Sequence, residues 1–171
     1  MTQILFKGKP IQTSGSLPAL QKKVPDFRLV DSNLQDCSLK TFAGKRKLIA
    51  TVPSIDTSVC SAMTKKLNEG AKKRPNALIL VVSADLPFAQ KHYCEREEVN
   101  NVQIFSIMRD KSFGKDYGLA IQDGPLEGLL ARSLMVINEK DELIYVELVP
   151  EITNEPNYDK AFEALGLVTR P

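Results

Sequence analysis

Histidine and tryptophan are nearly absent from the sequence, whose 171 residues include one histidine and no tryptophan. A single histidine excludes most sites in which several histidines bind a metal ion, and most catalysis by a histidine base. Long apolar runs are missing too, since the longest, residues 77–82, is far shorter than the roughly 20 residues of a membrane-spanning helix. Residues 1–10 lack the apolar core and the small-residue cleavage site of a secretory signal, so we expect a cytoplasmic protein without a membrane partner.

An excess of charge of one sign is also lacking. The chain carries 23 Lys and Arg against 21 Asp and Glu, and a net charge of +2 gives no electrostatic reason to expect a nucleic-acid partner. Its three cysteines are widely spaced, and a chain of this length needs no disulfide framework. In a reducing compartment they would be free, bound to a metal or in redox use. The length and the absence of a linker favour a single domain, residues 1–171.

What the sequence does contain is an alternation of strand patterns with helical ones. Residues 4–11 predict a small N-terminal hairpin. Further strands are expected at residues 27–30, 34–39, 47–52, 77–82, 102–107, 134–137 and 143–148. Helices are expected over residues 59–71, from residues 85–87 onward, over 110–118 and over 155–166. This order predicts an α/β fold with a mixed central sheet and helices on both of its faces.

Cys60 lies in the first turn of the predicted helix that directly follows the buried strand 47–52. Free N–H groups and the positive end of the helix dipole favour an anion there, and thiols at helix N-termini have pKa values below about 8.5. The thiolate is the nucleophilic form of cysteine, and ligands of open α/β sheets bind beyond the ends of the strands. The alternative is that Cys60 is only a small apolar residue on the helix face formed by Met63 and Leu67.

Residues 53–60, Pro-Ser-Ile-Asp-Thr-Ser-Val-Cys, have the pattern Pro-x-x-x-Thr-x-x-Cys. The pattern resembles the active-site loop of the peroxiredoxins, which are thiol peroxidases with a thioredoxin-like fold. Four more segments are similar to the bacterial thiol peroxidase subfamily and extend the resemblance over nearly the whole chain: residues 42–45, 83–94, 123–132 and 151–158. The resemblance implies a thioredoxin-like fold and a peroxidase that needs no bound cofactor or metal ion.

The resemblance assigns Cys60 the role of the nucleophile, which attacks one peroxide oxygen and leaves as a sulfenic acid. Thr57 would hydrogen-bond the sulfur or the peroxide, although its residue type is equally that of a helix N-cap. Arg132 would stabilise the thiolate and the developing oxyanion, whereas without the motif it would be interpreted as a surface charge. Pro53 would shape the loop and shield the sulfenate from water.

The same resemblance makes Cys94 the resolving cysteine, whose thiol condenses with the sulfenic acid to form a disulfide. A disulfide needs Cα atoms about 4.4–6.8 Å apart, and packed helices lie further apart, so we expect local unwinding when it forms. The sequence departs from the subfamily directly afterwards, where Glu-Arg-Glu-Glu at 95–98 replaces the usual glycine-rich stretch. Thioredoxin as the reductant, a homodimer and a preference for alkyl over hydrogen peroxide are further implications.

Cys37 and His92 have no place in this pattern. Cys37 is interpreted as a structural, half-buried residue of a strand, and His92 as an exposed residue. A zinc site built from both of them with Cys60 and Cys94 would lack the Cys-x(2–4)-Cys spacing of such sites. Two alternatives on the same fold stay open. One is a thiol–disulfide oxidoreductase, although Thr57 stands where its Cys-x-x-Cys motif needs a cysteine. The other is a non-enzymatic, redox-gated binding protein.

Overall fold

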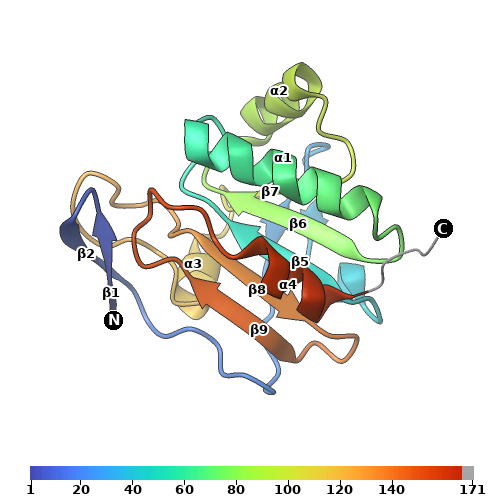
Figure 1. Cartoon of the computed structure of the whole chain (residues 1–171), viewed down its shortest axis with the longest axis horizontal. Helices are drawn as coiled ribbons and strands as arrows, with labels where there is room; N and C mark the ends of the chain where they lie inside the picture. Colours follow the sequence, from blue (N-terminus) through green and yellow to red (C-terminus); the bar gives the residue numbers. More distant parts are fainter. Residues whose placement is uncertain (167–171) are drawn as a thin grey trace.

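A seven-stranded mixed sheet forms the centre of the computed structural model, which describes residues 1–166 (Figure 1). The last five residues of the expected domain 1–171 lie outside the described residues. The elements are β1 (Thr2–Phe6), β2 (Lys9–Thr13), β3 (Leu29–Val30), β4 (Asp36–Cys37), the 3₁₀ helix η1 (Leu39–Phe42), β5 (Lys47–Thr51), α1 (Ser58–Lys72), β6 (Leu78–Ser83), α2 (Pro87–Glu97), β7 (Gln103–Ser106), α3 (Ser112–Asp116), β8 (Ser133–Ile137), β9 (Leu143–Leu148) and α4 (Tyr158–Leu165).

The strands of the sheet lie in the order β4-β3-β7-β6-β5-β8-β9, while β1 and β2 form a separate antiparallel hairpin. The three middle strands β5, β6 and β7 run parallel, and β8 pairs antiparallel with β5 and with β9. Because β6 is covered on both faces, its sequence is a continuous apolar run rather than an alternation. The expected mixed sheet, the late hairpin and the N-terminal hairpin are therefore confirmed.

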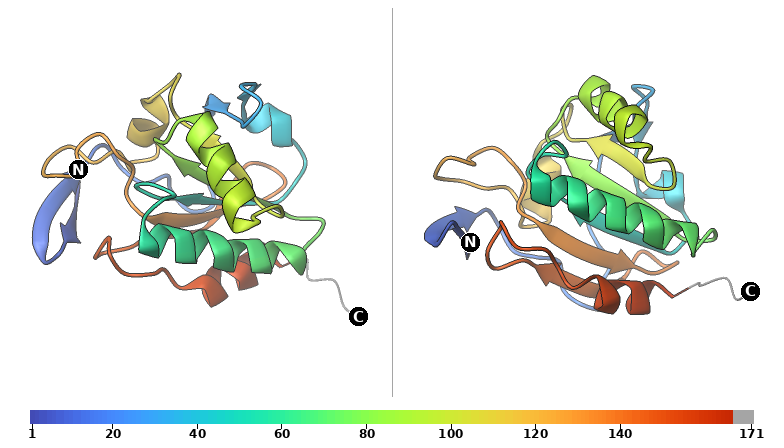
Figure 2. Two further views of the ribbon diagram at one scale, coloured as in Figure 1. Left: turned by 90° about the horizontal axis from the view of Figure 1, so that it is seen from above. Right: turned by 45° about the horizontal axis from the view of Figure 1, so that its top comes forward.

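Helices cover both faces of the sheet, as the sequence predicted (Figure 2). Alternate residues of each central strand point to opposite faces, so Leu48 and Ala50 of β5 pack in one hydrophobic cluster and Ile49 packs in the other. The first cluster also contains the apolar faces of α1 and α4, and the second contains side chains of η1 and α3. Cys60 belongs to the cluster beneath α1 and α4, whereas Cys37 belongs to the opposite one.

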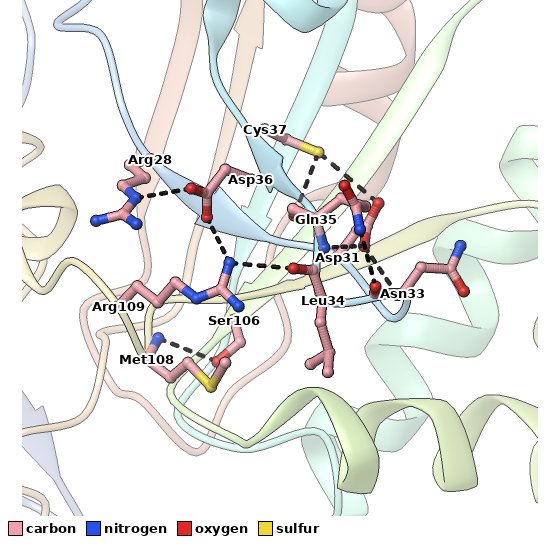
Figure 3. Close-up of polar contacts among 10 residues, drawn as sticks. All are labelled: Arg28, Asp31, Asn33, Leu34, Gln35, Asp36, Cys37, Ser106, Met108 and Arg109. Atoms are coloured by element: carbon pink, nitrogen blue, oxygen red, sulfur yellow. Dashed lines mark hydrogen bonds and ion pairs between the residues drawn. The ribbon is translucent and has the colours of Figure 1, made fainter.

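The expected strand at residues 34–39 is wrong over most of its length. Leu34 has a φ of +65°, and only Asp36 and Cys37 pair with β3. The reason is the carboxylate of Asp31, which accepts hydrogen bonds from the backbone N–H groups of Asn33 and Gln35 and closes a tight turn (Figure 3). A chain bent in this way reverses direction before residue 36, and η1 follows at Leu39.

Capping residues place the helix ends close to the expected positions. The Thr57 side chain caps α1, the Asn157 side chain caps α4, and Pro87 occupies the first turn of α2. Gly118 follows α3 with a φ of +69°, a left-handed conformation that suits glycine. Among the helices of residues 1–166, none is long and apolar enough to cross a membrane.

Candidate active site

Cys60 is the third residue of α1, beyond the carboxyl end of the parallel strand β5. Its backbone N–H donates to Thr57 Oγ1 at 3.3 Å, so the Thr57 hydroxyl acts as the helix cap in this structure. The Cys60 side chain is completely buried in the cluster beneath α1 and α4. A peroxide can therefore reach Cys60 Sγ only when the surrounding side chains move apart.

Arg132 precedes β8, the strand that pairs with β5, and this pairing brings it beside Cys60 although the two are 72 residues apart in the sequence. The guanidinium Nη2 donates to Cys60 Sγ at 3.4 Å, and Nη1 lies 3.5 Å from Met63 Sδ. The third guanidinium nitrogen, Nε, donates to the Ile152 carbonyl oxygen at 2.8 Å. Arg132 is only 3% exposed, so the interpretation of an isolated arginine as a surface charge does not apply to it.

The loop between β5 and α1 is held by Asp85, which the sequence had suggested as part of a helix start and of the motif at 83–94, without a role in the site. Asp85 follows β6, the strand next to β5. Its carboxylate accepts hydrogen bonds from Ser54 Oγ at 2.9 Å, the Ile55 N–H at 2.9 Å and Ser83 Oγ at 2.6 Å. Pro53, in the same loop, is buried. A carboxylate at the end of a strand parallel to β5 is the signal that could have identified this anchor.

Cys94 lies on α2, half-buried against the cluster that contains Cys60, and both cysteines are free thiols. Burial, and secondarily the charge of Glu95, raises the pKa of the Cys94 thiol to about 11. Cys94 lines a cavity of about 290 Å³ formed by α2, β7 and the turn after β3, and Cys60 is not part of its lining. The structure therefore presents Cys94 to a cavity that Cys60 does not share.

Polar contacts hold α1 and the loop before it against α2 and the loop after it, and we call these contacts the α1–α2 clasp. They are Asp56 Oδ1–Arg96 Nη2 at 2.9 Å, Ser61 Oγ–Tyr93 Oη at 2.9 Å, Lys65 Nζ–Glu97 Oε2 at 2.7 Å and Asn68 Oδ1–Asn101 N at 2.7 Å. Two of the four depend on residues 95–98, where the sequence departs from the subfamily pattern. That segment thus adds ion pairs between the helices.

Tyr158 and Glu155 are further residues near the site, for which the sequence suggested a place in the last helix and in the motif at 151–158 but no role in the site. The Tyr158 hydroxyl donates to Glu155 Oε1 at 2.8 Å. Burial first, and then this carboxylate, raises the pKa of Tyr158, on which the charges of Arg132 and Cys60 also act. Tyr158, the first residue of α4, packs against the hydrophobic cluster that contains Cys60.

The remaining two candidates lie elsewhere. Cys37 is 8% exposed on the opposite face of the sheet from Cys60, so these two thiols cannot bind one zinc ion. Its Sγ faces Asp31 and the Gln35 carbonyl oxygen (Figure 3), and burial raises the pKa of its thiol. His92 is exposed on α2, as expected.

Known proteins are similar to this chain over nearly its whole length. A family model described as Redoxin matches residues 19–162. A thiol peroxidase of Leptospira interrogans serogroup Icterohaemorrhagiae serovar copenhageni is 47% identical over 166 residues, which are 96% of this chain and 97% of that protein. Among solved structures, a peroxiredoxin-like protein from Aquifex aeolicus has a TM-score of 0.91 at 38% identity and covers 96% of both chains.

A thiol peroxidase from Chromobacterium violaceum, 21% identical, shares the fold with a TM-score of 0.89 over 95% of this chain and 94% of that chain. These similarities confirm the expected thioredoxin-like fold. Together with the matched family model and the 47% identical relative, they show that the chain belongs to the Redoxin family and, within it, to the thiol peroxidases.

Proposed function

We propose that the chain acts as one domain, residues 1–171, and is a thiol-dependent peroxidase whose nucleophile is Cys60. The observation that carries the proposal is the buried contact of 3.4 Å between Arg132 Nη2 and Cys60 Sγ. Within residues 1–166, no carboxylate forms an ion pair with Arg132. A buried cation needs a counter-charge, and in the proposed reaction a thiolate at Cys60 would supply one.

In the proposed reaction the Cys60 thiolate attacks one oxygen of the peroxide. An S–O bond forms, the O–O bond breaks, and the departing alkoxide or hydroxide takes a proton from the solvent, while the sulfur becomes a sulfenic acid. Arg132 stabilises the thiolate before the step and the developing oxyanion during it. Thr57 positions Cys60 by capping its helix and offers its hydroxyl to the peroxide, and Pro53 shields the sulfenate from water.

Replacing Arg132 by methionine is expected to lower the rate constant of the first oxidation about 100- to 1,000-fold, because one buried charged donor to the transition state is lost. Methionine keeps most of the side-chain volume and removes the charge. The rate constant is measured by competition with a second peroxidase for a limiting amount of peroxide. Arg109→Met removes an exposed arginine that bonds Asp36 and the Leu34 carbonyl oxygen, and serves as the control for the same chemical change away from Cys60. Equal rate constants for Arg132→Met and wild type would exclude Arg132 from the reaction.

We propose that the Cys94 thiol then attacks the Cys60 sulfur, so that an S–S bond forms and water leaves. With α2 folded as in this structure, the pKa of about 11 keeps Cys94 protonated at neutral pH and thus weakly nucleophilic. Unwinding of α2 would remove the burial that raises this pKa and would also bring Cys94 within bonding distance of Cys60. One movement therefore both activates the resolving thiol and delivers it.

Weakening the α1–α2 clasp is expected to speed up disulfide formation. The double substitution Arg96→Gln, Glu97→Gln removes the ion pairs to Asp56 and Lys65, and we expect the disulfide to form about two- to fivefold faster after one equivalent of peroxide. The measurement is mass spectrometry of acid-quenched samples. Glu69→Gln, which removes the exposed Glu69–Lys72 ion pair within α1, is the matched control.

Hydrogen exchange provides a second readout of the same movement. We expect lower protection of residues 58–61 and of α2 in the oxidised protein than in the reduced protein. Equal protection in both redox states, together with an unchanged rate of disulfide formation in the double variant, would contradict an unwinding step.

Recycling of the disulfide requires a dithiol, and we propose thioredoxin, which transfers two electrons and two protons by thiol–disulfide exchange. We further propose alkyl hydroperoxides and hydrogen peroxide as substrates, a homodimer as the assembly and the cytoplasm as the location. The relationship to thiol peroxidases supports these assignments, and the redox use of thiols suits a reducing compartment.

The test of the function is oxidation of NADPH by wild-type protein with a peroxide, thioredoxin and thioredoxin reductase, combined with peptide mapping after one equivalent of peroxide. We expect peroxide-dependent NADPH oxidation, a Cys60–Cys94 disulfide and a free Cys37. If NADPH is oxidised no faster with the protein than without it, the proposed peroxidase function is refuted. Reduction of disulfide substrates in that case would indicate a thiol–disulfide oxidoreductase.

A further inference from the structure

The N-terminal hairpin lies beside the loop between β9 and α4 (Figure 2). The carboxylate of Glu151, in that loop, joins the two segments. Its Oε1 accepts the Lys7 N–H and its Oε2 accepts the Gly8 N–H, each at 3.0 Å. Lys7 and Gly8 form the hairpin turn, and both have a positive φ, at +51° and +78°. In this turn conformation two successive N–H groups point at one anion, an arrangement that binds a carboxylate fork.

Backbone hydrogen bonds extend this junction on both sides of Glu151. The Leu5 N–H donates to the Pro150 carbonyl oxygen at 2.7 Å, and the Ile152 N–H donates to the Leu5 carbonyl oxygen at 2.9 Å. Segment 150–152 therefore lies along β1 like a short additional strand. The hydroxyl of Thr153 also donates to Glu151 Oε1, at 2.8 Å.

The same segment forms the backbone support of Arg132. The Ile152 carbonyl oxygen accepts the Arg132 Nε–H at 2.8 Å, and the Arg132 carbonyl oxygen accepts the Val149 N–H at 3.0 Å. The bond to Nε leaves both terminal nitrogens of the guanidinium for Cys60 and Met63. A continuous series of contacts thus runs from the hairpin turn through Glu151 and Ile152 to Arg132 and Cys60.

We propose that Glu151 is a positioning residue for the peroxidase reaction, which clamps the hairpin turn onto segment 150–152 and thereby fixes the Ile152 carbonyl that aims Arg132 at Cys60. This proposal rests on the proposed function, because it assigns Glu151 a role in the peroxidase reaction. The contacts of Glu151 and Arg132 do not depend on that function. Glu151 touches neither Arg132 nor Cys60 in these contacts and acts only through the backbone that it holds. Because a displacement of about 1 Å in a catalytic group can cost up to 100-fold in rate, such a clamp has kinetic consequences.

Glu151 keeps its charge over the working pH range. The bonds from Gly8, Thr153 and Lys7 lower its pKa to about 2. A carboxylate whose pKa is lowered on folding stabilises the folded state above its unfolded pKa, and this contribution is lost as the pH falls towards 2. Glu151 is therefore ionised, and accepts the hydrogen bonds from the hairpin turn, at every pH at which the peroxidase would work.

The test compares Glu151→Gln, Glu151→Ala and Glu151→Asp with wild type. Glutamine keeps the shape of the side chain but its NH₂ group cannot accept a hydrogen bond, so one of the two turn N–H groups loses its partner. We expect the rate constant of the first oxidation to fall about 10-fold in Glu151→Gln and further in Glu151→Ala, with partial rescue in Glu151→Asp. Glu127→Gln, the same substitution at an exposed position in the neighbouring loop, is expected to change nothing.

A second readout separates positioning from a purely structural role and from the peroxidase proposal itself. The rate of alkylation of Cys60 by iodoacetamide is followed against pH by peptide mass spectrometry, which needs no peroxide. We expect the pH profile to move to higher pH in Glu151→Gln and not in Glu127→Gln. If the profile and the oxidation rate match wild type while only the melting temperature falls, Glu151 is structural and the inference is overturned. If Glu151→Ala does not fold, the near-isosteric Glu151→Gln still decides. If the alkylation profile of Cys60 moves in Glu151→Gln while the wild-type protein has no peroxidase activity, the proposed function is refuted. The positioning of Arg132 by Glu151 then still stands.

Discussion

Replacement of Cys60 by serine is expected to abolish peroxide consumption, whereas the same replacement at Cys37 is expected to leave it unchanged. An alcohol is not ionised at neutral pH, so serine offers neither an anionic nucleophile nor a counter-charge for Arg132. The substitution is nearly isosteric, and the hydroxyl can still accept the hydrogen bond from Arg132 Nη2. The measurement is thioredoxin-dependent NADPH oxidation with an alkyl hydroperoxide.

Cys37→Ser is the matched control for this result because it makes the same chemical change in another buried cysteine. Cys37 packs in the hydrophobic cluster on the face of the sheet opposite to Cys60. Both variants should therefore lose some stability, and only one should lose activity. Thermal unfolding of both proteins shows whether a loss of activity reflects the fold. Peroxide consumption by Cys60→Ser at the rate of wild type would mean that another thiol reacts.

The position of Cys60 was predictable because its determinants are local. A buried strand, a polar capping residue and an apolar helical period lie within residues 47–71, and together they place the thiol in the first turn of a helix. The structure confirms this placement, with Thr57 as the cap. Rules of this kind depend only on residues that are close in the sequence, so the start of a helix can be predicted without knowing how distant segments pack.

Arg132 was not predictable from such rules. Its contact with Cys60 arises because β8 pairs with β5, and a pairing between strands far apart in the chain leaves no mark on the residues around position 132. Only the resemblance to peroxiredoxins singled it out. Asp85 and Glu151 were missed for the same reason, since each acts on a segment distant in the sequence. The strand expected at residues 34–39 failed differently, because the Asp31 side chain competes for the backbone N–H groups that a strand would use.

Replacement of Cys94 by serine is expected to leave the first oxidation within about twofold of wild type and to stop thioredoxin-dependent turnover after that step. Cys94 lies outside the contacts of Arg132 with Cys60, so the attack on peroxide should not depend on it. Without a second thiol the sulfenic acid persists, and excess peroxide oxidises it to the sulfinic acid, which thioredoxin cannot reduce. Mass spectrometry of Cys60 and NADPH oxidation measure the two effects separately.

The loss of thioredoxin-dependent turnover in Cys94→Ser distinguishes a resolving cysteine from one that merely packs in α2. If Cys94 were only structural, Cys94→Ser would disturb α2 and lower the melting temperature, yet thioredoxin-dependent turnover would continue. Cys94 is half-buried, its pKa is raised to about 11, and we propose that its reactivity depends on the opening of the α1–α2 clasp. The Arg96→Gln, Glu97→Gln substitution in a Cys94→Ser background should therefore no longer affect oxidation products, because the opened helix has no thiol to deliver. Acceleration of any Cys60 disulfide in that triple variant would show that a different cysteine resolves the sulfenic acid.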